Sequence, residues 1–268
     1  MFDNTILVCN DELKEHGLEI VGQVQEMLKG RNYETVRLDE IDSSCFTGID
    51  LVITIGGDAT LLRPACYLKD IPILGIKGDP KSKGHLTSLD ANNVFLLENI
   101  LQGDYTLIQR QRAQATRNNE LMDELVLNEV YFGTKDPKTS MRYVVCFKGH
   151  EEEHRGSGFV VATGTGSTAR YSSMAQDPLS FEKRDVSFDY DAKLLKFLVD
   201  DLNRDYGNPI LIHGEFGKEE KITLESRMNS NGYIAIDGCK KEYGFNKGDV
   251  VEVSLSDIPL NVVVPFST

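Results

Sequence analysis

Two nearly unbroken apolar runs constrain the fold of this chain more than any other feature of its sequence. They are "IDLVITI" (49–55) and "IPILGIK" (71–77). Parallel strands that helices cover on both faces have this pattern, whereas half-solvated strands alternate apolar and polar residues. "TILVCN" (5–10) predicts a further strand, and "GLEIVGQVQEMLKG" (17–30) predicts an amphipathic helix closed by Gly30. Strands that alternate with helices indicate a doubly wound α/β domain.

After about residue 100 the pattern changes to closely spaced strands separated by Gly- and Asn-rich turns. We expect an all-β region there, most simply a β-sandwich, because many short strands with turn signals between them are typical of that architecture. The expected strands cover 106–117, 125–133, 142–149, 157–164, 210–216, 221–228, 232–237, 250–256 and 260–264. Residues 189–207 have helical spacing and predict one helical insertion in the series.

Composition limits the classes of partner. The chain has 268 residues and a formal net charge of −13, so we expect neither nucleic acid nor an anionic membrane as a partner. The five cysteines are scattered and form no Cys-x-x-Cys pair, which is typical of reduced thiols. No signal peptide and no membrane-spanning stretch is expected, and the expected location is the cytoplasm.

A glycine-rich turn follows one of the apolar runs, in "ITIGGDATLLRPA" (53–65). Gly56 and Gly57 come at the carboxyl end of the expected strand, where open α/β sheets place their ligands. Without side chains they let backbone N–H groups approach a phosphate, and the N-terminus of the next helix adds partial positive charge. We expect that helix to begin near Thr60 to Arg63, with Thr60 as its N-cap or as a phosphate ligand. The chain has no Walker-type P-loop sequence.

Asp58 follows the two glycines, and its residue type leaves two interpretations open. A carboxylate at this position can simply cap the helix, which is the commoner role for an isolated Gly-Gly-Asp. Beside a phosphate site, it can also accept the proton of an attacking hydroxyl during phosphoryl transfer.

A second polar turn, "ATGTGSTAR" (162–170), gathers three hydroxyls and two glycines after an expected strand. Such residues are common in flexible loops, but two donor-rich turns in one chain suggest two polar ligands meeting at a domain cleft. "LNEV" (127–130) adds Asn128 and Glu129. Adjacent residues on a strand point to opposite faces, so both reach one ligand only near a strand end or a bulge.

"HEEEH" (150–154) matches the zinc-protease pattern His-Glu-x-x-His, which requires a helix to bring both imidazoles to one face. Because it lies between two strand-like runs, we interpret it as a hairpin turn with solvated charges and exclude a zinc hydrolase.

The ordered set of motifs resembles the NAD kinase family. "GGDAT" is similar to the Gly-Gly-Asp-Gly-Thr motif that NAD kinases share with lipid kinases and phosphofructokinases, and "LNEV" followed by "TGTGSTA" selects NAD kinases among them. "AIDG" (235–238) and "GDPKSKGHL" (78–86) are similar to further elements of the family, the latter to its mitochondrial-type branch. The resemblance covers most of the chain.

The resemblance implies a domain organisation and a set of site residues. It implies an N-terminal α/β domain (1–100) on which a segment at about 258–268 packs back, and a C-terminal β-rich NAD-binding domain (101–257). It also implies transfer of the γ-phosphate of ATP to the adenosine 2′-hydroxyl of NAD, with Mg²⁺ or another divalent cation accompanying ATP and a homo-oligomeric assembly. The implied base is Asp58, the ATP-binding residues are Gly56, Gly57 and Thr60, and the NAD-binding residues are Asn128, Glu129, Thr165, Ser167, Thr168 and Ala169.

Four positions depart from the family pattern. Ala59 replaces a glycine; if this position needs a positive φ, alanine costs about 1 kcal/mol, so either the backbone is ordinary here or phosphate binding is altered. Ser157 replaces an aspartate expected near the nicotinamide half of NAD, and Arg170 replaces an aromatic residue. "HLTSL" (85–89) lacks the phenylalanine that often stacks on adenine.

Two other functions stay open from the sequence. Ala59 and Arg170 are compatible with a non-catalytic NAD(P)-binding regulator. A lipid or sugar kinase can share the glycine–aspartate turn, although the charge of −13 argues mildly against a membrane substrate.

Overall fold

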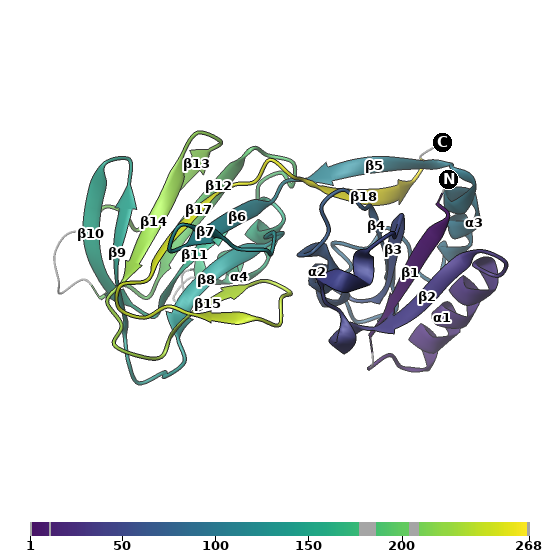
Figure 1. Cartoon of the computed structure of the whole chain (residues 1–268), viewed down its shortest axis with the longest axis horizontal. Coiled ribbons are helices and arrows are strands. Elements are labelled where there is room, and N and C mark those ends of the chain that lie inside the picture. Colours follow the sequence, from purple (N-terminus) through teal and green to yellow (C-terminus); the bar gives the residue numbers. More distant parts are fainter. Residues whose placement is uncertain (1, 11, 177–185, 204–208, 267–268) are drawn as a thin grey trace. The chain divides into compact units, whose positions relative to one another are not determined.

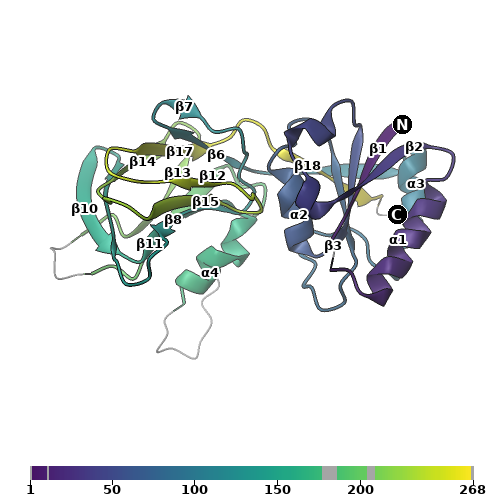
Figure 2. The same ribbon diagram turned by 60° about the horizontal axis from the view of Figure 1, so that its bottom comes forward.

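The structure, a computed structural model, describes residues 2–10, 12–176, 186–203 and 209–266. The chain divides into two compact units: unit 1 is Met1–Arg110 with Leu260–Thr268, and unit 2 is Gln111–Pro259. Unit 1 is an α/β unit and unit 2 is built from antiparallel β-sheets, which confirms the expected fold class (Figures 1 and 2). In the described part of the chain, no helix combines the length and hydropathy needed to cross a membrane.

Unit 1 is organised around one six-stranded sheet. Its strands are β1 (Asn4–Cys9), β2 (Asn32–Arg37), β3 (Leu51–Gly56), β4 (Ile73–Lys77), β5 (Tyr105–Arg110) and β18 (Leu260–Pro265). They lie in the order β2-β1-β3-β4-β18-β5, and every neighbouring pair is parallel except β18 and β5. All six residues of β3 are buried, as the unbroken apolar run predicts for a central parallel strand.

Helices cover both faces of this sheet (Figure 1). The helices are α1 (Glu15–Met27), α2 (Asp58–Ala65) and α3 (Leu97–Gln102), with short 3₁₀ turns at Leu38–Glu40, Ser43–Phe46 and Val94–Leu96. Ile20 and Val24 of α1 share a buried cluster with Leu97 and Ile100 on the α3 side. On the opposite face α2 packs against β3 and β4, where Leu61 lies against Gly75 so closely that a Cβ there would sit 2.8 Å from its Cδ1.

Unit 2 consists of two six-stranded antiparallel sheets. The first contains β6 (Ala113–Arg117), β7 (Glu120–Leu121), β9 (Met141–Phe147), β10 (His150–Gly156), β14 (Lys221–Ser226) and β17 (Val250–Leu255). The second contains β8 (Glu129–Thr134), β11 (Gly158–Ala162), β12 (Leu194–Asp200), β13 (His213–Gly217), β15 (Gly232–Ile236) and β16 (Glu242–Gly244). Their orders are β10-β9-β14-β17-β6-β7 and β13-β12-β11-β8-β15-β16.

The two sheets of unit 2 enclose one apolar core. Phe132, Phe159 and Phe197 come from the second sheet and Tyr143 comes from the first, and all belong to one buried cluster. The outer face of the second sheet is covered by α4 (Arg170–Met174), which follows the 3₁₀ turn Gly166–Thr168. Tyr171 packs there against side chains of β8 and β11.

The expected strand 106–117 is in fact two strands that belong to different sheets. β5 ends at Arg110 and pairs with β18 in unit 1, whereas β6 begins at Ala113 in unit 2. Between them lies Arg112, whose fully buried side chain donates from Nε to the carbonyl of Ile258 at 2.9 Å. Unit 1 therefore extends to residue 110 rather than 100. The sequence did not indicate this boundary, because strand-forming residues continue across it without a break.

The prediction of a helix over 189–207 is wrong. Residues 194–200 form β12, in which Leu195, Phe197 and Val199 are buried, and residues 204–207 lie outside the described part. The sequence "LLKFLV" (194–199) fits both periods, since its apolar residues also recur at helical spacing. Burial between neighbouring strands decides the outcome.

The "HEEEH" sequence is a strand rather than a hairpin turn, so it lacks the helix that the zinc-protease pattern needs. His154 is 1% exposed, and its Nε2 lies 2.9 Å from Oε2 of Glu152. The expectation that all the polar side chains of this segment are solvated is therefore wrong for His154. Among the described residues, no group of three His, Cys, Asp or Glu side chains gathers as a metal centre.

Phe159→Ala tests the core of unit 2. Phe159 is fully buried and stacks on Phe197 at 5.5 Å between ring centroids, so we expect a loss of about 3–5 kcal/mol in the free energy of unfolding. Urea denaturation followed by circular dichroism measures it. Leu121→Ala, at a side chain 63% exposed, is the control and should change stability by less than about 0.5 kcal/mol. A similarly small loss for Phe159→Ala would contradict this account of the core.

Candidate functional site

The glycine turn of unit 1 lies at the carboxyl end of β3. Gly56 ends the strand, Gly57 is the extended N-cap, and α2 begins at Asp58, not at Thr60 to Arg63 as expected. A Cβ on Gly56 would lie 2.1 Å from Oγ1 of Thr60, so a larger residue cannot occupy that position without moving the helix. Gly57, which has no side chain and is half-buried, leaves backbone accessible at the N-terminus of α2, where anions are favoured.

Asp58 does not cap its own helix. Its Oδ1 accepts a hydrogen bond from the backbone N–H of Leu86 at 2.9 Å, and its Oδ2 accepts one from His85 at 3.2 Å. Both donors belong to the segment that follows β4, so a distant loop fixes the orientation of this carboxylate. A carboxylate has about four acceptor positions. Two hydrogen bonds therefore leave acceptor capacity on this half-buried group.

Thr60 is 1% exposed, and its Oγ1 has no hydrogen-bond partner among the described residues. Buried hydroxyls without partners are uncommon, and each one asks for an explanation such as a missing ligand. This hydroxyl lies in the first turn of α2, beside the two glycines. It is the kind of orphaned donor that a phosphate oxygen or a hydrated cation can satisfy.

Ala59 is an exposed residue within α2 and does not have a positive φ. The sequence left open either an ordinary backbone at Ala59 or altered phosphate binding. The first alternative holds, and alanine causes no backbone strain at this position.

In unit 2, the carboxylate of Asp237 holds the start of β8. It accepts hydrogen bonds from the backbone N–H groups of Asn128 at 2.8 Å and Glu129 at 2.9 Å. Asn128 therefore immediately precedes the strand and Glu129 begins it, the strand-end position at which two adjacent residues can serve one ligand. The sequence reasoning did not select Asp237, although it lies in the "AIDG" element.

The second polar turn packs against this strand end. Thr163 donates its backbone N–H to the carbonyl of Asn128 at 2.9 Å, and a Cβ on Gly166 would lie 2.1 Å from the same oxygen. The two stretches singled out in the sequence, 127–130 and 162–170, are therefore brought together within unit 2.

The four expected residues of the turn differ in what they can offer a ligand. Ser167 is fully buried and donates its hydroxyl to the carbonyl of Gly164 at 2.6 Å, so it shapes the turn. Thr168 is exposed and donates to the carbonyl of Thr165 at 3.3 Å. Thr165 is 7% exposed, and Ala169 is half-buried just before α4. The accessible part of the turn is thus its second half.

Two carboxylates and one guanidinium dominate the electrostatics here. Burial, and then the nearby Asp237, raise the pKa of Glu129, while Arg170 works in the opposite direction with Nε 4.0 Å from Oε1. Burial also raises the pKa of Asp237, against the lowering effect of the backbone N–H groups that it accepts. Oε2 of Glu129 is buried without a partner among the described residues. Arg170 lies over the ring of Tyr131 at 4.4 Å, which fixes this cation beside the carboxylates.

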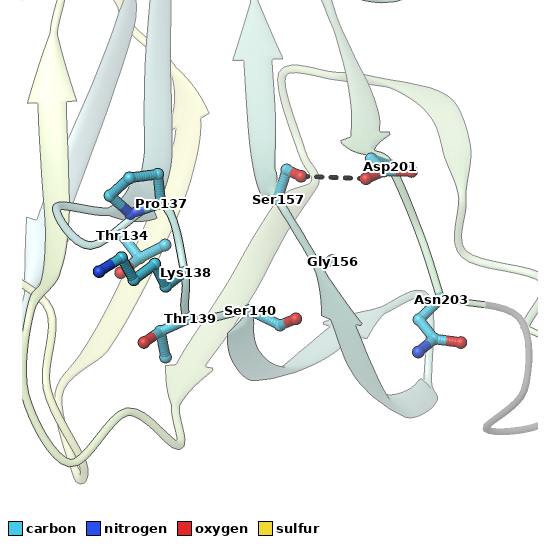
Figure 3. A pocket seen from close by; sticks show the side chains of 9 residues that line it. All are labelled: Thr134, Pro137, Lys138, Thr139, Ser140, Gly156, Ser157, Asp201 and Asn203. Atoms are coloured by element: carbon cyan, nitrogen blue, oxygen red, sulfur yellow. Dashed lines mark hydrogen bonds between the residues drawn. The ribbon is translucent and has the colours of Figure 1, made fainter.

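A polar cavity of about 560 Å³ lies elsewhere in unit 2 (Figure 3). Ser157, the residue that departs from the family's aspartate, lines it and donates its hydroxyl to Oδ2 of Asp201 at 3.3 Å. A carboxylate is therefore present beside position 157, supplied by the segment after β12. Lys138 and Thr139 line the opposite wall.

These features define a class of protein: an α/β unit with a glycine turn at a helix N-terminus, and a β-unit in which a polar turn packs against a strand end that carries a carboxylate. Residues 6–105 match the family model of the ATP-NAD kinase N-terminal domain. The chain is 39% identical over 134 residues to the NAD kinase of Methanothermobacter thermautotrophicus, covering 48% of this chain and 46% of that one. It is 31% identical over 195 residues to the NAD kinase of Pyrococcus furiosus, covering 65% and 67%. The chain belongs to the NAD kinase family.

A solved structure agrees at the level of fold. Yeast NADH kinase complexed with NADH superposes with a TM-score of 0.78 at 12% identity, covering 97% of this chain and 83% of that one.

The buried carboxyl pair predicts a pH dependence of stability. Glu129 binds its proton more tightly in the folded than in the unfolded chain, because its folded pKa is raised. The folded state therefore loses stability as the pH rises from the ordinary carboxyl range through that raised pKa. Glu129→Gln keeps the shape without the titration. The free energy of unfolding should fall between about pH 5 and pH 8 in both proteins. We expect the fall to be smaller in Glu129→Gln than in the parent, by about 1 kcal/mol or more.

Urea denaturation at the two pH values measures this difference. Glu153→Gln, at an exposed glutamate of β10, is the matched control and should follow the parent. An unchanged pH dependence in Glu129→Gln would contradict the assignment.

Proposed function

We propose that this protein transfers the γ-phosphate of ATP to the 2′-hydroxyl of the adenosine ribose of NAD or NADH, giving NADP or NADPH and ADP. The observation that carries the proposal is the Asp58 carboxylate, oriented through both oxygens by the backbone of His85 and Leu86 beside the bare Gly56–Gly57 turn. Membership of the NAD kinase family supplies the reaction class.

In the proposed reaction, Asp58 accepts the proton of the 2′-hydroxyl as its oxygen attacks the γ-phosphorus of ATP. The new P–O bond forms as the bond between the γ-phosphorus and the bridging oxygen to the β-phosphate breaks, and ADP leaves with that oxygen. A sugar hydroxyl is a poor nucleophile near neutral pH, so holding it in line beside an oriented carboxylate is a large part of the catalysis. The acceptor capacity left on Asp58 is what this step uses.

The turn of unit 1 fits the phosphates and a divalent cation. The half-buried backbone of Gly57 and the hydroxyl of Thr60, which has no partner among the described residues, can satisfy phosphate oxygens or water on the cation, while Gly56 lets Thr60 approach the turn closely. Mg²⁺ keeps several waters and is commonly held by one or two carboxylates together with substrate phosphates. When bound with ATP, the cation would neutralise charge that develops on the transferred phosphate.

In unit 2, we assign the dinucleotide to the strand end formed by Asn128 and Glu129 and to the turn carrying Thr165, Ser167, Thr168 and Ala169. Ribose hydroxyls are donors, and Glu129 has a buried oxygen without a partner that can accept from one. Asp237 keeps both backbone amides in place, so it positions the site without needing to touch the ligand.

The proposal also includes a cytoplasmic location and a homo-oligomeric state. All five cysteines are free thiols, which supports a reducing compartment. The family resemblance supports the assembly.

Asp58→Asn tests the proposal directly. The amide keeps the size of the side chain but cannot accept a proton, so we expect NADP formation from Mg-ATP and NAD to fall by about 10²–10⁴-fold. The production of NADP and NADPH, from NAD and NADH in parallel, is followed by chromatography of the nucleotides.

Binding of NAD, measured by calorimetry, serves as the internal control and should persist in Asp58→Asn. A parent protein that binds NAD but forms no NADP would instead support the non-catalytic regulator. Phosphorylation of diacylglycerol or a sugar without activity on NAD would support the third alternative.

A further inference from the structure

Lys77 stands at the same edge of the sheet as the glycine turn. It is the last residue of β4, and in the parallel register it lies opposite Gly56. The carboxyl ends of neighbouring parallel strands meet at one edge, which is where ligands of open α/β sheets bind. A cationic side chain at this position is therefore beside the segment that the proposed function assigns to phosphate.

The stem of Lys77 packs against the loop that orients Asp58. A Cβ built on Gly84 would lie 3.2 Å from Cδ of Lys77 and 3.9 Å from its Cε, so the lysine stem lies beside Gly84 and leaves little room for a side chain there. Gly84 has a φ of +71°, which favours glycine, and it immediately precedes His85, whose N–H binds Asp58. The lysine, the loop and the carboxylate thus form one connected arrangement inside unit 1.

In the described part of the chain, no carboxylate pairs with the ammonium group of Lys77. Within the described residues it has neither an ion pair nor a hydrogen bond, although the whole chain carries 42 acidic residues against 29 Lys and Arg. Five other lysines do pair with carboxylates: Lys29, Lys135, Lys148, Lys218 and Lys221. Lys77 is also half-buried, so leaving its charge without a counterion is less favourable than at the surface.

We infer that Lys77 binds the phosphate chain of the donor nucleotide. The ammonium contributes a compact positive charge, whereas the bare turn contributes directed N–H donors. Thr60 follows the turn, and its buried hydroxyl also has no partner among the described residues, so it adds a further donor suited to an anion. The inference rests on the proposed function for the identity of the donor, and it adds a residue specific to phosphate rather than to the dinucleotide.

The test separates phosphate binding from catalysis. Inorganic tripolyphosphate is titrated into the full chain by calorimetry, and the KM values for Mg-ATP and for the dinucleotide are measured separately. For Lys77→Met we expect the Kd for tripolyphosphate and the KM for Mg-ATP each to rise about tenfold or more, with the dinucleotide KM changed less than about twofold. Lys77→Arg keeps the charge and should recover most of the affinity.

Lys29→Met is the matched control, since Lys29 is an exposed lysine just after α1 whose one ion pair among the described residues is with Glu26. It should leave all three constants unchanged. If Lys77→Met lowers the melting temperature, Lys77→Gln replaces it, because its polar end tolerates the half-buried site. Unchanged tripolyphosphate binding in a folded neutral variant, or an equal rise in both KM values, overturns the inference.

The proposed function can fail independently. A parent protein that forms no NADP, but binds tripolyphosphate through Lys77, would refute the kinase activity and retain the phosphate-binding role. If the parent forms NADP but the KM for Mg-ATP does not change in the Lys77 variants, the kinase activity is supported and the phosphate-binding role of Lys77 is refuted.

Discussion

The hydrogen bonds between Asp58 and the backbone of His85 and Leu86 are the interaction on which the α/β unit's site depends. They join the first residue of α2 to a segment 27 and 28 residues later in the chain. Without them, the carboxylate would be free to turn towards the N–H groups of its own helix and cap it, as aspartates at helix starts commonly do. The loop after β4 therefore converts a common helix-start residue into an oriented acceptor, and Lys77 packs its stem against that same loop.

Unit 2 contains a similar arrangement, in which one carboxylate accepts hydrogen bonds from two backbone N–H groups far away in sequence. Asp237 accepts the N–H groups of Asn128 and Glu129, which are 109 and 108 residues away, and so fixes the end of β8. Here burial raises the pKa of the carboxyl, although Asp237 as a whole residue is half-buried, as Asp58 is. Both aspartates thus fix distant backbone, and the proposed function assigns proton transfer to Asp58 because it follows the glycine turn of unit 1.

Sequence reasoning succeeded where a local pattern determines the structure. The buried parallel strands and the glycine turn follow from unbroken apolar runs and from residues without side chains, and both are local properties. It failed for residues 194–199, because their apolar spacing satisfies both periods and only the neighbouring strands decide between them. Asp237 and Lys77 were missed for another reason: their importance comes from backbone groups and strand ends far away in sequence, which one sequence read alone does not reveal.

Three of the four departures from the family pattern become coherent once they are placed in the structure. Ala59 occupies an ordinary helical position, so it adds no strain to the turn. Ser157 is hydrogen-bonded to Asp201, which returns a carboxylate to that region. Arg170 adds a cation near Glu129, where burial and Asp237 disfavour the ionised form, so it offsets part of the cost of keeping that side chain an acceptor. Because none of these changes removes a group that phosphoryl transfer needs, Ala59 and Arg170 no longer give structural grounds for a non-catalytic protein.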